Sequence, residues 1–221
     1  AARSVLNLRY RLLPHLYSLM YRAHSAGRTV HNALWMHFPQ DKNTFTQDGQ
    51  YMWSDGLLFT PVLTEGAHSV LGYFPSGLWF SLFTDECLES TGQFVELETP
   101  LLATNAHVRG GMVIPMQEFG MTTAQVTASP YTLLVALSDT KEATGGVFVD
   151  DGKQLELDSA SDVEYRVSQH MLVSEVILQT NEEVSHQSLL GSIEILEASS
   201  APASRCDGYI IRTSGSSSDH A

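Results

Sequence analysis

The nine histidines of this chain raise the hypothesis of a metal site. His31 and His37 have an even separation, so on one β-strand their side chains would share a face. Six residues at about 3.3 Å each would still place them about 20 Å apart, too far for one ion. His15 and His24 would lie about 13 Å apart along a helix, with no carboxylate beside them. We therefore predict packing or surface histidines and no metal site.

The adjacent carboxylates of Asp150 and Asp151 could serve as a general acid and a general base. Neighbouring residues of a strand point to opposite faces, so these two would not converge on one substrate atom. Gly152 follows them, and Asp-Gly is a strong signal for a hairpin turn because glycine tolerates a positive φ. The sequence favours the turn over the catalytic pair.

Sequence motifs that carry catalytic nucleophiles or bind nucleotides give no stronger evidence for an active site. Cys87 lies beside Glu86 and Glu89, whose negative charges disfavour the reactive thiolate. The chain has no Gly-x-Ser-x-Gly elbow, and Arg109–Gly111 lacks the spacing of a dinucleotide or phosphate loop. We predict no catalytic, cofactor-binding or metal-binding residue in this chain, and no cofactor.

Aromatic side chains gather in one predicted hairpin. They could stack on sugar rings, but packing in a core is the more common use of such a cluster, and we favour it. The residues are Tyr73, Phe74, Trp79, Phe80 and Phe83.

Composition excludes several classes of protein. With 221 residues, 43% of them hydrophobic, the chain can form one large domain or two small ones and is not disordered throughout. The net charge of −13 argues against nucleic-acid binding, and no apolar run approaches the roughly 20 residues of a membrane span. Two cysteines exclude a disulfide scaffold.

The charge is unevenly distributed along the sequence. Residues 1–40 carry five arginines and no acidic residue, whereas the remainder carries 7 basic and 25 acidic residues. A solvent-exposed helix usually mixes the two signs. This asymmetry, and the start at Ala1 rather than Met, favour an internal piece of a longer chain.

The first 27 residues predict a helix. Apolar residues recur at helical spacing over 4–26, with Ser4 as a possible N-cap and Gly27 as the stop. Pro14 should kink or divide this helix. The apolar side chains cover most of its circumference, which is typical of a helix buried on several sides.

The rest of the chain predicts a mainly β fold of antiparallel sandwiches, because short alternating segments are separated by turn residues. Thr29–Phe38 is a β-rich run, and a domain boundary is expected near Ser138–Thr144. Further strands are expected at 57–63, 69–74, 78–83, 93–97, 106–108, 113–116, 131–137, 146–149, 163–167, 171–179 and 192–196.

Five segments, in this order, resemble glycoside hydrolase family 31, the α-glucosidase family, and its eukaryotic members in particular. They are Leu8–Tyr17 with the following Gly27, Gly56–Leu63, Gly72–Trp79, Val108–Pro115 and Asp150–Gly152. The resemblance covers residues 3 to about 180. This chain departs from the family in having Asn32-Ala33-Leu34 where relatives read Arg-Pro-Leu, and Gly49 before Gln50.

The resemblance implies an architecture. Residues 1–54 would be the tail of a catalytic (β/α)₈ barrel, with its last helix and exit segment. Residues 55–137 would be the proximal C-terminal β-sandwich, and 138–221 a distal C-terminal β-domain, incomplete here. The family's two catalytic aspartates would lie upstream, in the barrel, so no residue of this chain inherits a catalytic role.

The resemblance also implies a function. The parent enzyme would hydrolyse terminal α-linked glucose with retention of configuration, in a lysosomal, vacuolar or secreted setting. This chain would act as a scaffold whose partner is the rest of the barrel, and would be inactive alone. The alternative is a non-catalytic sugar-binding or interaction module. If the chain is a fragment, the barrel-facing leucines Leu8, Leu12, Leu16 and Leu19 should be exposed in it.

Overall fold

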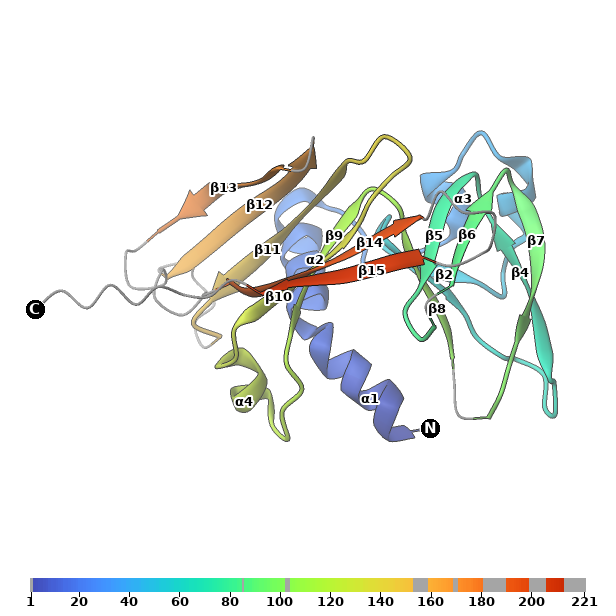
Figure 1. Cartoon of the computed structure of the whole chain (residues 1–221), viewed down its shortest axis with the longest axis horizontal. Helices are drawn as coiled ribbons and strands as arrows, with labels where there is room; N and C mark the ends of the chain where they lie inside the picture. The colour runs from blue at the N-terminus through green and yellow to red at the C-terminus, as the bar shows by residue number, and fades with distance from the viewer. Residues whose placement is uncertain are drawn as a thin grey trace, which may run out of the picture.

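The computed structural model describes residues 2–84, 86–101, 104–152, 159–168, 171–180, 190–198 and 206–212. Figure 1 shows two β units at opposite ends of the molecule, with a helix pair lying along the region where they meet. The mainly β fold with sandwich packing that the sequence predicts is confirmed.

The predicted N-terminal helix is divided in two, as Pro14 indicated. Helix α1 spans Ala2–Arg11 and α2 spans Leu13–Ala26, with Leu12 between them and Pro14 in the first turn of α2. Gly27 ends α2 in the left-handed conformation at φ +65°, as expected for a C-cap. Ser4 is not an N-cap, because α1 already begins at Ala2.

The predicted strand over Thr29–Phe38 is largely wrong. Within this run only His31–Asn32 forms a strand, β1, and Leu34–His37 forms the single helical turn α3. The helical turn buries Leu34 completely while leaving Trp35 and Met36 exposed, which an alternating strand could not do for three consecutive residues. A 3₁₀ turn, η1, follows at Lys42–Thr46.

The first β unit is a six-stranded sheet packed against a two-stranded one. The six-stranded sheet has the order β1-β2-β3-β8-β5-β6, and β4 pairs with β7. Leu34, Met52, Leu58 and Trp79 from the side of the larger sheet pack on Tyr73 of β4. The strands are β2 (Tyr51–Trp53), β3 (Leu57–Thr60), β4 (Ser69–Phe74), β5 (Gly77–Ser81), β6 (Cys87–Ser90), β7 (Gln93–Glu98) and β8 (Asn105–Arg109).

The second β unit is a seven-stranded mixed sheet with the order β13-β12-β11-β9-β10-β14-β15. The pairs β9–β11 and β10–β14 are parallel, and the other pairs are antiparallel. A short helix, α4 (Thr123–Thr127), links β9 to β10. The strands are β9 (Met112–Gln117), β10 (Tyr131–Ala136), β11 (Ala143–Asp150), β12 (Ala160–Ser168), β13 (Met171–Gln179), β14 (Leu190–Ala198) and β15 (Cys206–Arg212).

This sheet draws strands from both sides of the expected boundary near residue 138. Strands β9 and β10 precede the boundary, yet β9 is hydrogen-bonded to β11, which follows it. The division into a barrel tail at 1–54, a proximal sandwich at 55–137 and a distal domain at 138–221 stays a prediction. Residues 213–221 of the last part lie outside the described residues.

One apolar core joins the helix pair to both β units. Leu12 is only 2% exposed and packs with Leu57 and Phe80 of the six-stranded sheet and with Ile114 and Leu134 of the seven-stranded sheet. Burying a leucine fully stabilises a fold by about 1.5–3 kcal/mol. The junction of helix and sheets is therefore part of the hydrophobic core.

The expectation that four helix leucines would be exposed is corrected by this packing. Leu12 and Leu19 are buried, and Leu8 and Leu16 are half-buried. The two β units of the chain itself cover the face of the helix pair that carries these leucines. The exposed apolar side chains are Val5, Leu6, Tyr17 and Met20.

Candidate functional site

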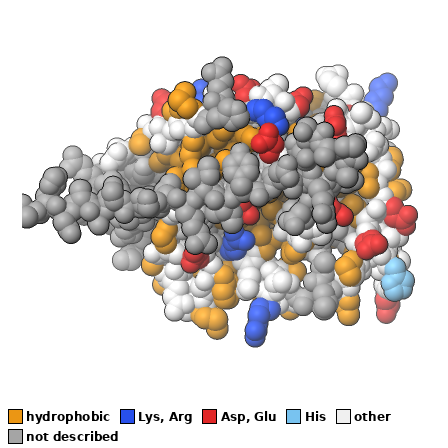
Figure 2. Space-filling view, viewed as in Figure 1, with side chains coloured by type: hydrophobic (Ala, Val, Ile, Leu, Met, Phe, Trp, Pro, Cys, Tyr) orange, Lys and Arg blue, Asp and Glu red, His pale blue; other side chains and the backbone are white. Residues whose placement is uncertain are grey.

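Helices α1 and α2 carry exposed apolar side chains at the N-terminal end of the fold. Leu6 is 48% exposed and Met20 is 51% exposed. Arg3 and Arg9 lie among the exposed residues of α1, and α1 has no acidic residue in its first turn. Figure 2 shows apolar and charged side chains side by side on the face that it draws. An apolar, basic helix face of this kind can dock another protein element.

A second apolar surface lies at the edge formed by β1, β2 and β3. The rings of Tyr51 and Phe59 are stacked with centroids 5.1 Å apart, and Trp53 lies 5.1 Å from the same phenylalanine ring. The indole Nε1 of Trp53 donates a 2.6 Å hydrogen bond to Nε2 of His31. Nε2 of His31 is the acceptor of this bond, which ties the side chain of β1 to that of β2.

A buried polar junction lies where α2 meets the turn between β2 and β3. Ser54 in this turn has a positive φ of 49°, and its hydroxyl donates to Oδ1 of Asp55. His15 of α2, Arg22 and Asp55 line a cavity of about 40 Å³, large enough for about one or two water molecules. Nε2 of His15 is buried without a hydrogen-bond partner among the described residues.

The electrostatics of His15 follow from this position. Burial, and then the positive charge of Arg22, lower the pKa of His15 to about 4, although Asp55 acts in the opposite direction. His107 of β8 is also buried, against the ring of Phe74, and burial lowers its pKa to about 4. Both imidazoles are neutral near pH 7, so they act as packed polar groups there.

The histidines that the sequence grouped in pairs do not form shared sites in the structure. His31 lies on β1 and His37 at the end of the turn α3, so the prediction that they share one strand is wrong. His15 and His24 both lie on α2, the first buried and the second exposed. Within the residues that the structure describes, no cluster of three or more His, Cys, Asp or Glu side chains could bind a metal ion.

The Asp150–Gly152 segment begins the connection between β11 and β12. Gly152 has a φ of +65°, and its N–H donates a 2.9 Å hydrogen bond to Oδ1 of Asp150. Oδ2 of the same carboxylate accepts from the hydroxyl of Tyr17. The connection is longer than a two-residue hairpin turn, because Asp150 pairs with Ala160.

Most of the predicted aromatic cluster is core, as favoured. Tyr73, Phe74, Trp79 and Phe80 are at most 1% exposed, and Phe83 is half-buried. Burial of their ring faces leaves those four with no surface for a sugar.

The structure also places the cysteine and the glycine-containing loop that the sequence raised as candidates. The free thiol of Cys87 lies half-buried on β6, and Arg109–Gly111 carries the chain from one β unit into the other. Among the described residues, no helix has the length and apolarity to cross a membrane.

Sequence reasoning missed one ion pair that joins distant parts of the fold. Arg11 at the end of α1 lies 3.7 Å from Glu194 of β14. Neither residue belongs to a motif, and no local signal in the sequence pairs them. Two cavities open on either side of this pair.

The comparisons with known proteins agree on one family. Residues 27–114 match the family model described as glycosyl hydrolase family 31 C-terminal domain. The chain is 35% identical to lysosomal alpha-glucosidase of Rattus norvegicus over 91% of its length, which is 23% of that protein. It is 43% identical to a probable alpha-glucosidase of Oryza sativa over 71% of its length and 18% of that protein. The chain thus spans about a fifth of these relatives.

Solved structures share the fold. The crystal structure of a glucosidase II alpha subunit superimposes with a TM-score of 0.87 at 22% identity, over 96% of this chain and 27% of that one. A dextranase of Flavobacterium johnsoniae superimposes with a TM-score of 0.76 at 23% identity, over 90% of this chain and 25% of that one.

Proposed function

This chain belongs to the C-terminal portion of glycoside hydrolase family 31, and we propose that it is the structural C-terminal part of an α-glucosidase-type enzyme. Relatives that match this chain carry α-glucosidase names, and the chain aligns to about a fifth of their length. In this proposal the whole protein hydrolyses terminal α-linked glucose, and this part holds the catalytic barrel in place.

The observation that carries the proposal is the two-sided character of helices α1 and α2. One face, with Leu12 and Leu19, is buried against the two β units of the chain itself. Leu6 and Met20 lie outside this buried face and are about half exposed. A helix whose apolar side chains extend beyond its buried face suits a position between two bodies, and in this proposal the second body is the barrel.

The chemistry of the proposal places both catalytic carboxylates in that barrel. A retaining glycosidase needs a nucleophile and an acid/base group about 5–5.5 Å apart. In this chain Asp150 is engaged in binding Tyr17 and Gly152, which suits a structural role. The contribution of the chain to catalysis is to position barrel elements through the α1–α2 face.

The test measures hydrolysis of one chromogenic α-glucoside by two proteins. We expect the 221-residue chain alone to give no turnover above a mock purification from the same host. Turnover should appear when the chain is extended at its N-terminus by a family 31 barrel. Hydrolysis by the isolated chain that co-purifies with it through several columns would overturn the proposal.

A further inference from the structure

A groove runs along the flank of α1 where this helix faces the seven-stranded sheet. It consists of two cavities, of about 620 Å³ and about 200 Å³, that share Arg11 and Glu194 as lining residues. The side chains of this pair are 39% and 32% exposed and lie 3.7 Å apart, beyond hydrogen-bonding distance. The guanidinium therefore keeps donors, and the carboxylate keeps acceptors, for a ligand in the groove.

The larger cavity combines an aromatic ring with hydroxyl and carboxylate groups. Phe119 is 43% exposed, and its ring meets that of Tyr10 edge to face with centroids 5.8 Å apart. Glu118 is also a lining residue, as are Thr132 and Ser192, whose hydroxyls are hydrogen-bonded to each other at 2.8 Å. The volume is within the ordinary range of small-molecule sites, about 300–1,000 Å³.

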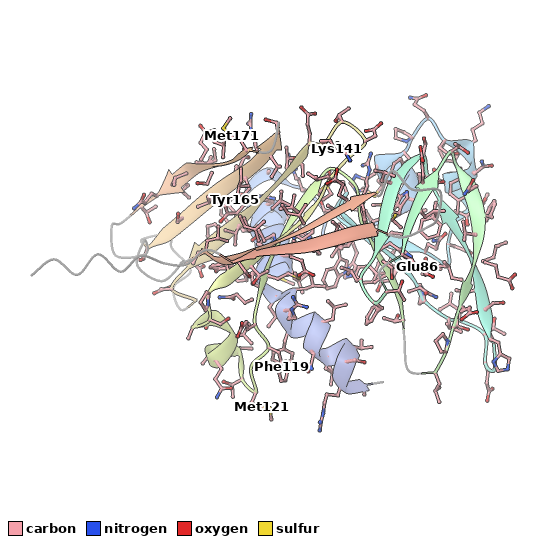
Figure 3. All side chains as sticks on the ribbon, viewed as in Figure 1. Glu86, Phe119, Met121, Lys141, Tyr165 and Met171 are labelled. Carbon is pink, nitrogen blue, oxygen red and sulfur yellow. The ribbon has the colours of Figure 1, made fainter. Side chains whose placement is uncertain are left out.

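The smaller cavity repeats this combination on the other side of the ion pair. Its lining includes the half-buried Phe83 together with Thr84 and Glu86, and the hydroxyl of Thr84 donates to the carboxylate of Glu86. Figure 3 labels Glu86 and Phe119, which lie toward opposite ends of the groove, near the six-stranded sheet and near α4 respectively. The groove thus offers an aromatic ring, a carboxylate and a hydroxyl on each side of a central Arg–Glu pair.

The charge of the lining limits the kind of ligand. Three glutamates, Glu86, Glu118 and Glu194, and one arginine, Arg11, line the two cavities. This excess of negative charge disfavours phosphates, nucleotides and other anions. The many polar groups disfavour a purely apolar ligand, because they would be buried without partners. A neutral ligand that is rich in hydroxyl groups and has apolar C–H faces suits both requirements.

We propose that this groove is a non-catalytic binding site for a neutral oligosaccharide. A sugar ring stacks on Phe119, neighbouring hydroxyls bind the facing groups of Arg11 and Glu194, and the chain of sugars extends toward Phe83 and Glu86. The site requires no carboxylate pair and no bond cleavage. It is independent of the proposed hydrolysis, which takes place in the barrel.

The experiment measures binding of maltotriose to the 221-residue chain by titration calorimetry and by saturation-transfer NMR. Wild type should bind at millimolar or lower concentration. Phe119→Ala should weaken binding about three- to tenfold, since it removes one stacking surface. Arg11→Gln should weaken it by a similar factor, because the charge-assisted bonds are lost. The matched control is Phe45→Ala, which removes a 56% exposed ring that is not among the lining residues of the groove, and it should bind like wild type.

Three outcomes would overturn the proposal. These are no maltotriose binding by wild type, equal loss in Phe45→Ala and Phe119→Ala, or tighter binding of an anionic oligosaccharide than of the neutral one. Circular dichroism of each variant separates loss of binding from loss of fold. Because the assay uses the isolated chain and reads no hydrolysis, its result is separate from the test of the α-glucosidase proposal.

Discussion

The hydroxyl of Tyr17 on α2 donates a 2.6 Å hydrogen bond to Oδ2 of Asp150, the last residue of β11. Burial and this bond to the carboxylate raise the pKa of Tyr17 to about 12. Two further contacts reinforce the same junction. The ring of Tyr21 stacks on Phe148 with centroids 3.6 Å apart, and the N–H of Phe148 donates a 2.9 Å bond to Oγ of Ser18. Helix α2 is therefore tied to the seven-stranded sheet by polar bonds as well as by apolar packing.

Replacing Ser18 with Ala should destabilise the protein by about 1–3 kcal/mol, because the N–H of Phe148 would be left buried without a partner. Tyr17→Phe should cost less, about 0.5–1.5 kcal/mol, since the Tyr17 hydroxyl lies at the surface. Urea unfolding measures the loss of stability in both variants. Ser25→Ala, at an exposed position of the same helix, is the control and should leave the midpoint unchanged. Equal effects at Ser18 and Ser25 would contradict the assignment.

Leu12→Ala should be among the most destabilising substitutions in the helix pair, at about 2–5 kcal/mol, because it opens a cavity between both β units. Leu6→Ala removes a side chain of the same size from an exposed position of α1 and should change stability by less than about 0.5 kcal/mol. Thermal unfolding of the two variants tests which face the chain covers. A larger loss at Leu6 would reverse that assignment.

The exposed face of the helix pair should cause self-association of the isolated chain. Leu6 and Met20 are bare in the monomer, and the proposed barrel would cover them. The double substitution Leu6→Glu and Met20→Glu should reduce dye binding and multimer formation without lowering the unfolding midpoint. Analytical ultracentrifugation and dye fluorescence report these effects. A wild-type chain that is monomeric and binds no dye would remove the main argument for a missing barrel.

Acid should destabilise the folded chain through His15 and His107. The unfolded chain takes up a proton at each near pH 6.5, whereas the folded protein does so only near pH 4. The unfolded state therefore binds more protons in this interval, and stability falls as pH drops from about 6.5 to about 4 and then levels off. Over this interval each histidine lowers the free energy of unfolding by an amount on the order of 3 kcal/mol.

Urea unfolding of wild type, His15→Gln and His107→Gln across this interval checks the acid effect. Each variant should lose less stability on acidification than wild type, whatever its stability near neutral pH. Carboxylate protonation is common to all three proteins and so cancels in the comparison. Parallel curves for all three would show that neither imidazole is neutral in the fold.

Gly152→Val should cost roughly 1–2 kcal/mol, because a β-branched residue is disfavoured at a φ of +65°. No atom lies within 4 Å of the Cβ that a substitution would add, so the loss comes from the backbone alone. In a whole enzyme, loss of activity in Asp151→Asn with an unchanged unfolding midpoint would refute the turn interpretation.

The sequence by itself determined the local structure of this protein. Pro14 divided the helix and Gly27 ended it, since both act through their own backbone angles. Alternating apolar residues located most of the strands, because each strand repeats every two residues. The family emerged from short motifs for the same reason, as each motif is a local run of residues.

Only the tertiary structure decided which surfaces meet. The helix is apolar around much of its circumference, so its pattern did not reveal that Leu12 is covered while Leu6 is bare. Strand β9 follows β8 after two residues, yet it pairs with β10 and β11 in the other sheet. The pairing of Arg11 with Glu194, and hence the groove around it, has no local signature. Such contacts join residues far apart in the chain, and long-range packing of whole elements selects them.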